Sequence, residues 1–239
     1  MIILDEHKTL DKIIKDRCSI ARFGDGELKL LYSQGQMYQK PSRELSDALR
    51  DVIKRPPKSL LVGVPRWDLE SLKDNKFWKR YFHRDYTKPF QGRTWHSAFI
   101  TRPDLIPEID NKKYWDKMKQ IWDGRPIVLV QGKGREFEHP PNLLSNASRV
   151  DIVYAARKNA FVWRYTLRKQ VRTMLIENGL AVLSLGPTAT VLAYDLACDG
   201  YQALDLGHAG VFYSGVHPKS SSYGGEPYDN DKWCPCDNN

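Results

Sequence analysis

The stretch LAVLSLGPTATVLAYDLACDG, residues 180–200, decides the fold class. Its first residues form a continuous apolar run, which predicts a strand that is buried on both faces. The Gly186-Pro187 turn then leads into a helical pattern that ends just before Gly200. Proline suits the first turn of a helix, and glycine suits the position after its end. A buried strand that turns directly into a helix is typical of a parallel α/β sheet.

The same alternation of apolar runs and helical patterns extends over most of the chain. Parallel strands that are joined by helices form right-handed crossovers, so we expect an α/β domain with a mostly parallel sheet flanked by helices. The predicted strands are Cys18–Phe23, Ser59–Val64, Pro126–Gln131, Arg149–Tyr154, Ala181–Leu185 and Gln202–Leu206, and the predicted helices are Gly26–Ser33, Ser42–Lys54, Asn159–Asn178 and Thr188–Cys198.

Residues 67–121 depart from this pattern because they are rich in Trp, Tyr, Phe, Lys and Arg and have only weak periodicity. We expect a helical aromatic and basic insertion beside the sheet, which could act as a lid or an acceptor platform. The residues after His217 are polar and rich in Gly, Pro and Ser, which predicts a loosely ordered tail. The sequence thus predicts one domain over residues 1–216 and a polar tail over 217–239.

Composition indicates a globular protein with an excess of positive charge. Hydrophobic residues make up 41% of the chain and charged residues 28%, which is ordinary for a folded domain. No apolar run reaches about 18 residues, and the acid-containing start MIILDEHKTLDKIIKD does not resemble a secretory signal. We therefore expect a cytoplasmic protein, or one peripheral to the inner face of the membrane. The net charge of +8 favours anionic partners such as nucleotides, nucleic acid or an anionic membrane.

The four cysteines fit that compartment. Cys18 and Cys198 occur in apolar patterns, which predicts buried thiols. Cys234 and Cys236 are separated by a single residue, a shorter spacing than metal-site cysteine pairs usually have. We interpret that pair as an incidental feature of the tail, with a metal or redox role as the alternative.

The first candidate site is the segment RFGDGE, residues 22–27, which follows a predicted strand and opens a predicted helix. Its glycines, Gly24 among them, let the backbone turn sharply and approach a ligand. Asp25 and Glu27 can face one point, and carboxylate oxygens suit Mg²⁺ or Mn²⁺ held against a diphosphate. Arg22 could pair with phosphate. The alternative interpretation is a turn with acids favourably placed at a helix N-terminus.

The second candidate site is the helix start at Gly186, Pro187, Thr188 and Thr190. Free backbone N–H groups and the helix dipole make such a turn an anion site, to which the two threonines could add hydroxyl donors. It is neither a P-loop nor a GxGxxG motif, and the alternative is a well-capped helix. Arg135, in the glycine-rich segment after another predicted strand, is a further phosphate candidate.

The third candidate site lies at the end of the last predicted strand, where Asp205 is followed by Leu206, Gly207 and His208. Ligands gather at the carboxyl ends of strands in open α/β sheets. Asp205 or His208 could therefore act as the general base that deprotonates an acceptor hydroxyl. The alternative is a strand-end turn with a surface histidine.

A basic helix face is the fourth feature, because Arg164, Arg168 and Arg172 recur at every fourth position. The ordinary interpretation is a solvated helix face. The alternative is a surface for an anionic acceptor or for nucleic acid.

Three segments together resemble the GT-D glycosyltransferases, first catalogued as a bacterial domain of unknown function. They are ARFGDGE at 21–27, LGPTATVLAYDLA at 185–197 and LDLGH at 204–208. The stretches VLVQGKGREFEHPPNLL at 128–144 and KNAF at 158–161 are similar to the family as well. The resemblance covers residues 18 to 212, and its most specific part is LGPTATVLAYDL.

The resemblance implies a Rossmann-like fold, a nucleoside-diphosphate sugar donor, and a divalent metal, Mn²⁺ or Mg²⁺, bound by Asp25 and Glu27. It also implies that the turn at 186–190 contacts the donor diphosphate and that His208 belongs to the active site. We therefore expect a metal-dependent glycosyltransferase that moves a sugar to a hydroxyl acceptor. The expected donor is a UDP-sugar.

The acceptor that the resemblance implies is a surface polysaccharide, a glycoprotein or a lipid-linked glycan. Two alternatives remain: a glycosyltransferase acting on a hydroxylated base in nucleic acid, and a non-catalytic module that binds nucleotides or nucleic acid. A pure binding module has no need for two carboxylates beside a phosphate site. The chain also departs from the family pattern in Asn142-Leu143-Leu144 and in the run AGVFY after Gly207-His208, so the acceptor is not fixed by the resemblance.

Overall fold

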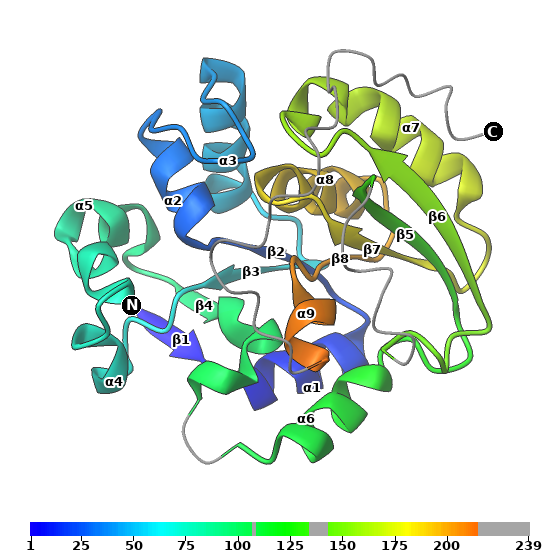
Figure 1. Ribbon diagram of the computed structural model, residues 1–239, viewed down its shortest axis with the longest axis horizontal. Helices are drawn as coiled ribbons and strands as arrows, with labels where there is room; N and C mark the ends of the chain where they lie inside the picture. Colours follow the sequence, from blue (N-terminus) through cyan, green and yellow to red (C-terminus); the bar gives the residue numbers. More distant parts are fainter. Residues whose placement is uncertain (107–108, 134–142, 215–239) are drawn as a thin grey trace.

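The computed structural model describes residues 1–106, 109–133 and 143–214 (Figure 1). Within these ranges eight strands form one sheet in the order β1-β4-β3-β2-β8-β7-β5-β6, and every neighbouring pair is parallel. The predicted parallel α/β sheet is therefore confirmed. The strands are β1 (Ile2–Leu4), β2 (Ser19–Arg22), β3 (Leu60–Val64), β4 (Thr94–Ser97), β5 (Pro126–Gly132), β6 (Arg149–Ala155), β7 (Leu180–Ser184) and β8 (Ala203–Asp205).

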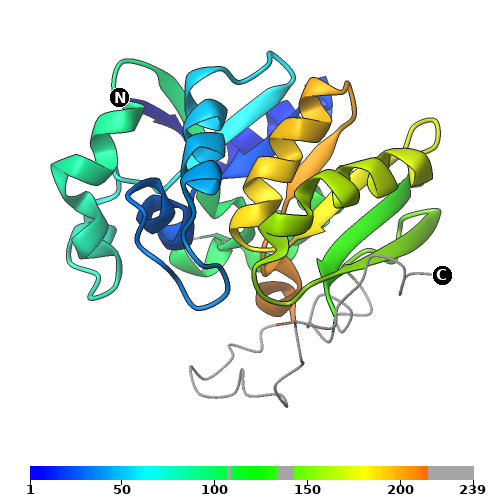
Figure 2. The same ribbon diagram turned by 90° about the horizontal axis from the view of Figure 1, so that it is seen from above.

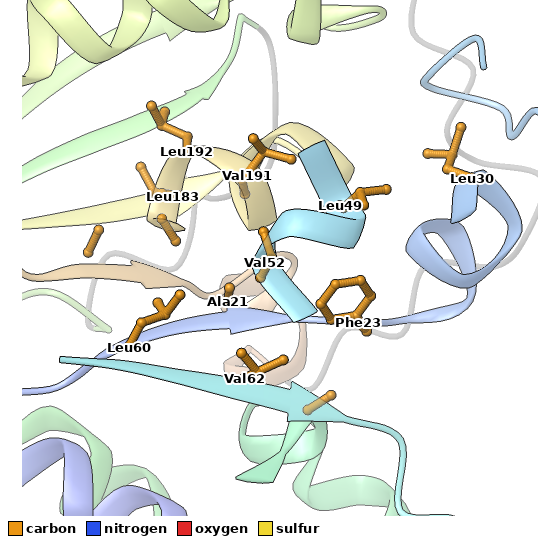
Figure 3. Packing of buried hydrophobic residues seen from close by; sticks show 14 of the residues in the cluster. Ala21, Phe23, Leu30, Leu49, Val52, Leu60, Val62, Leu183, Val191 and Leu192 are labelled. Atoms are coloured by element: carbon orange, nitrogen blue, oxygen red, sulfur yellow. The ribbon is translucent and has the colours of Figure 1, made fainter. Parts of the chain in front are cut away.

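Helices cover both faces of the sheet, because alternate side chains of each strand point to opposite faces. Ala21 and Val62 join a core on one face, whereas Ile20 and Leu61 join a core on the other. Figure 3 shows side chains of α3 and α8 packed over β2 and β3 on the first face. That face is covered by α2 (Asp25–Leu31), α3 (Arg43–Lys54), α7 (Arg164–Met174) and α8 (Pro187–Cys198), and the second face by α1 (Glu6–Asp16), α6 (Asn111–Lys119) and α9 (Ala209–Tyr213).

The two central strands, β2 and β8, are adjacent, and the chain leaves them in opposite directions. After β2 it enters α2, on one face of the sheet, and after β8 it enters α9, on the other face. Such a divergence is a topological switch point, and it opens a crevice at the carboxyl ends of the strands. The fold thus creates a site at the place where the candidate residues lie in the sequence.

The segment 67–121 corrects one expectation. It contains the short helices α4 (Glu70–Lys73) and α5 (Arg84–Thr87), but it also supplies β4, which lies inside the sheet between β1 and β3. Six of its aromatic side chains are buried because they extend the core around that strand; they are Trp67, Trp78, Tyr81, Phe90, Trp95 and Phe99. The prediction of an insertion beside the sheet is therefore wrong for this strand.

Three local predictions concern the cap of α3, the start of the helix after Asn159 and the burial of two cysteines. Ser42 caps α3 as predicted, because its hydroxyl accepts the Leu45 N–H at 3.1 Å. The helix predicted from Asn159 begins instead at Arg164, after a 3₁₀ turn, η6 (Ala160–Trp163). Cys18 is buried as expected, but Cys198, the last residue of α8, is exposed.

Two findings bear on the domain and membrane predictions. The tail beyond residue 214 lies outside the described residues. Across the ranges that are described, the structure contains no helix with the length and apolar character needed to span a bilayer.

Candidate active site

A cavity of about 450 Å³ opens at the switch point, at the carboxyl ends of the central strands. The structure brings three of the predicted segments to this one place. Arg22 and residues 24–27 line it after β2, Gly186 and Pro187 line it from the start of α8, and Asp205 and His208 line it from the end of β8. Segments that are far apart in the sequence therefore meet around one ligand-sized space.

Asp25 and Glu27 lie in the first turn of α2, but their environments differ. The Asp25 side chain is 40% exposed and lies 3.7 Å from the Lys29 ammonium. Glu27 is buried, and its carboxylate accepts the Gly24 N–H at 2.7 Å, closing the start of the helix. Asp25 is thus free to turn into the cavity, whereas Glu27 is fixed at its wall.

Negative charge is concentrated around Glu27. Burial, together with the charges of Asp205 and Asp25, raises the pKa of Glu27 to about 8. No group of three His, Cys, Asp or Glu residues gathers as a metal site among the residues that the structure describes. Mg²⁺ at a diphosphate is commonly held by one or two carboxylates together with phosphate oxygens. Two crowded carboxylates beside an anion site fit that mode of binding.

The start of α8 is built to receive an anion. Gly186 adopts φ +53°, no side chain caps the helix, and Pro187 occupies its first turn. The first N–H groups of a helix have no partner within it, and the helix dipole places positive charge there. A Cβ added to Gly26 would lie 3.7 Å from Pro187 Cγ, so the start of α2 lies close to the start of α8.

The two threonines of this turn do not face the cavity, contrary to expectation. Both are fully buried. The Thr190 hydroxyl lies 3.0 Å from the Arg22 carbonyl and 3.1 Å from Asp205 Oδ2, and Thr188 Oγ1 lies 3.5 Å from Gln39 Oε1. Their hydroxyls hold α8 to its neighbours because this face of the helix packs on the sheet. Only the backbone of this turn is available to a diphosphate.

Arg22 also differs from the expectation of a free phosphate ligand. Its guanidinium donates to the Asp205 carbonyl at 2.5 Å, to the Ala98 carbonyl at 2.9 Å and to Thr101 Oγ1 at 2.5 Å. These bonds join β2 to β8 and to η3 (Ala98–Thr101), which follows β4. Arg22 lines the cavity, but its main contribution is to hold three elements together at the floor of the cavity.

Asp205 is a buried partner of this arrangement rather than an open base. Its Oδ2 accepts the Arg22 N–H at 3.1 Å, and its Oδ1 lies 3.5 Å from Arg22 Nη2. Burial raises the pKa of Asp205 although Arg22 acts in the opposite direction. His208, in contrast, is exposed and lines the cavity. Of the two predicted bases, His208 is the better placed to reach a substrate.

A second, smaller cavity of about 40 Å³ adjoins the first. Both are lined by Tyr38, Gly186, Gly207 and His208, and the smaller one extends to Arg157. Arg135, the remaining phosphate candidate, lies outside the described residues.

Several lining residues carry no motif and were missed by sequence reasoning. Lys29 follows Asp25 by one helical turn, a spacing that predicts their ion pair. The others come from loops, 3₁₀ turns and the short helix α9, which no periodicity places; they are Gln36, Met37, Tyr38, Trp78, Phe99, Arg102 and Phe212.

The basic face predicted on α7 is largely neutralised. Arg164 forms a bidentate pair with Asp195 of α8, with N···O distances of 2.7 and 3.2 Å, and Arg168 forms another with Asp199 at 2.7 and 2.6 Å. Arg172 also lies 3.6 Å from Asp199. Arg164 and Arg168 join α7 to α8, so the interpretation as a solvated or nucleic-acid-binding face does not hold for these two, whereas Arg172 is 49% exposed and agrees with a solvated face.

A family model described as the glycosyltransferase GT-D fold matches residues 20–220. The chain belongs to the GT-D family.

Two solved structures share this fold over most of the chain. One represents the domain of unknown function 1792, described as having a distinct glycosyltransferase fold; it has a TM-score of 0.80 and 29% identity and covers 90% of this chain and 80% of its own. Another, described as a new glycosyltransferase from Streptococcus sanguinis, has a TM-score of 0.79 and 28% identity and covers 90% and 84%. The predicted family and its Rossmann-like fold are therefore confirmed.

Two curated relatives are longer proteins. A probable glycosyl transferase of Streptococcus gordonii is 30% identical over 219 residues, which cover 86% of this chain and 32% of the relative. Glycosyltransferase GlyD of Streptococcus pneumoniae is 30% identical over 211 residues, which cover 84% and 26%. The chain thus spans about a third and about a quarter of the length of these relatives.

Proposed function

We propose that the protein is a glycosyltransferase that moves a sugar from a nucleoside-diphosphate sugar to a hydroxyl acceptor. The donor that we propose is a UDP-sugar. The observation that carries the proposal is the meeting of two acidic side chains and two helix starts around one cavity in a GT-D fold. A diphosphate needs positive charge on both sides, which the helix starts and a bound cation would supply.

Asp25 and Glu27 are the residues that would hold a divalent cation, Mn²⁺ or Mg²⁺. When bound, that cation would neutralise the charge that develops on the leaving diphosphate. Burial raises the pKa of Glu27 first, and the charges of Asp205 and Asp25 raise it further. The contribution of these two carboxylates supports the assignment, because such crowding is unfavourable without a cation.

The remaining steps belong to the chain itself. The backbone N–H groups at Gly186 and after it bind diphosphate oxygens, and the Lys29 ammonium becomes available to them when Asp25 turns towards the cavity. Arg22 and Asp205 keep the ends of β2 and β8 in place. His208 accepts the proton of the acceptor hydroxyl if the sugar is transferred with inversion.

We infer an acceptor in surface glycan or glycoconjugate synthesis: a glycan, a glycoprotein or a lipid-linked sugar. A hydroxylated base in nucleic acid is less well supported, because the arginines of α7 are committed to Asp195 and Asp199.

The test is a screen of nucleotide sugars with and without Mn²⁺, first by thermal shift and then by donor hydrolysis. A specific donor raises the melting temperature by mass action. Asp25→Asn should lower metal-dependent hydrolysis about 100-fold or more. Asp16→Asn, at an exposed ion pair on α1, is the matched control and should leave hydrolysis unchanged. Full metal-dependent turnover by Asp25→Asn would refute the metal assignment, and tight nucleotide or nucleic-acid binding without turnover would favour a binding module.

A further inference from the structure

Two segments at the mouth of the cavities are joined into one surface, which we call the rim: residues 34–43 and 156–166. The Asn159 N–H donates to the Tyr38 carbonyl at 2.8 Å, and the Lys40 N–H donates to Asn159 Oδ1 at 2.8 Å. In Figure 2 the loop between α2 and α3 accordingly lies beside the start of α7. Tyr38 lines both cavities, and Arg157 lines the smaller one, so the rim borders the proposed active site.

The rim combines basic residues with exposed apolar side chains. Its two segments contain five basic residues and no acid; they are Lys40, Arg43, Arg157, Lys158 and Arg164. Met37 and Val162, at 72% and 71% exposure, are the most exposed large hydrophobic residues in the described part of the chain, and Tyr165 is 60% exposed. Arg164 pairs with Asp195 and Arg43 lies 3.7 Å from Asp47, so Lys40 and Lys158 are the basic residues on which docking would chiefly depend. Single exposed apolar residues are common on protein surfaces, but their concentration with basic residues at a cavity mouth is not.

This combination matches the chemistry of an anionic bilayer surface. Aliphatic and aromatic side chains enter the boundary between headgroups and acyl chains, while Lys and Arg are attracted to anionic lipids. Nucleic acid fits less well, because Met37 and Val162 offer no ring on which a base could stack. The Arg164 guanidinium is also engaged, with Asp195 and over the Tyr165 ring at 4.8 Å.

We propose that the rim docks on an anionic membrane surface and thereby turns the mouth of the active-site cavity towards the bilayer. The acceptor would then be a hydroxyl displayed at the membrane surface, as on a lipid-linked glycan. The choice of acceptor rests on the proposed function, whereas membrane docking does not.

The test is flotation of the full chain with vesicles of phosphatidylcholine, with and without phosphatidylglycerol. The protein should float with the anionic vesicles and not with the neutral ones, and salt should weaken binding. Lys40→Gln with Lys158→Gln should lower the partition coefficient about tenfold or more. Val162→Ser with Tyr165→Ser should lower the partition coefficient at both low and high salt, because salt does not screen the insertion of apolar side chains.

Matched controls lie at the opposite end of the sheet. Ile176→Ser removes a side chain that is also 60% exposed, and Lys54→Gln with Lys58→Gln removes two charges near the start of β3; neither change should alter flotation. None of the rim variants named here lines the larger cavity, so donor hydrolysis should be unchanged in all of them.

The outcomes separate the two proposals. Absence of binding to anionic vesicles, equal loss in the control variants, or single-stranded nucleic acid displacing the vesicles through the same lysines would each overturn membrane docking. Lipid-dependent flotation without any donor turnover would instead count against the proposed glycosyltransferase activity and leave docking intact.

Discussion

Arg22 and Gly207 form a tightly fitted pair at the floor of the cavity. Gly207 adopts φ +49°, and a Cβ at this position would lie 2.5 Å from Arg22 Nη2. Because the Arg22 guanidinium is held by Asp205, Ala98 and Thr101, it cannot move aside easily. Glycine is therefore required at position 207 for two reasons: its φ is positive, and Arg22 leaves no space for a Cβ.

Gly207→Ala should lower the free energy of unfolding by about 3 kcal/mol, of which backbone strain accounts for about 1–2 kcal/mol. Gly92→Ala is the matched control, since Gly92 has φ +79° but no atom within 4 Å of an added Cβ. Denaturant unfolding of both variants measures the difference. Equal losses of unfolding free energy in the two variants would show that Arg22 can move aside without an energetic cost.

The pKa of Glu27 predicts a pH dependence of stability. Its value of about 8 in the folded protein exceeds its ordinary value of 4.5, so the folded state retains this proton longer than the unfolded state. The stability that it contributes is complete below pH 4.5 and is lost as the pH rises towards 8. In EDTA, Glu27→Gln should gain stability relative to the wild-type protein over this interval, by on the order of a few kcal/mol. A difference that does not change with pH would contradict the raised pKa of Glu27 and its two causes, burial and the nearby carboxylates.

The residues of the site were predictable only in part. Asp25, Glu27 and Gly186 could be placed at the cavity because each follows directly on a buried strand of a parallel sheet. The directions of Thr188, Thr190 and Arg22 could not. The buried residues of α8 extend almost all round the helix, so no apolar stripe distinguishes the side that faces the sheet.

At the scale of elements, α7 and α8 are held together by ion pairs that follow the repeat of the helix. Arg164 and Arg168 of α7 match Asp195 and Asp199 of α8, one turn apart on each helix. The Arg164 and Asp195 side chains are only 13% and 4% exposed. A buried pair of this kind is costly to break, because the remaining charge keeps no partner.

Asp195→Ala should therefore destabilise the protein by about 3 kcal/mol. Asp16→Ala removes one partner of the exposed Lys12–Asp16 pair, whose side chains are 43% and 41% exposed, and should cost less than about 1 kcal/mol. Thermal unfolding of the two variants gives the comparison. A cost at Asp195 as small as that at Asp16 would mean that hydrophobic contacts alone join the two helices.

Elements with apolar runs were predictable, the three-residue β8 among them, whereas β1 and β4 were not. The strands around β5 and β7 are nearly continuous Val, Leu and Ile runs. β1 has three residues, and β4 has the sequence TWHS, in which no alternation is visible. Both lie at one side of the sheet, where pairing with β3 and packing of the neighbouring aromatic residues decide the structure.

At the scale of the whole molecule, the position of the site follows from sheet topology. The chain adds β3 and β4 on one side of β2 and returns through β5, β7 and β8 on the other, so β2 and β8 meet at the switch point. Every predicted site residue that the structure describes lies at or beside the carboxyl ends of the central strands. This arrangement explains how segments almost 190 residues apart can serve one cavity.

The most direct measurement is a crystal structure of the protein with Mn²⁺ and the donor nucleotide that gives the largest thermal shift. We expect an anomalous peak for manganese beside Asp25 and Glu27, with the diphosphate between that peak and the backbone N–H groups at the start of α8. A diphosphate bound outside this cavity, or manganese held by other residues while the diphosphate is ordered, would contradict the proposal.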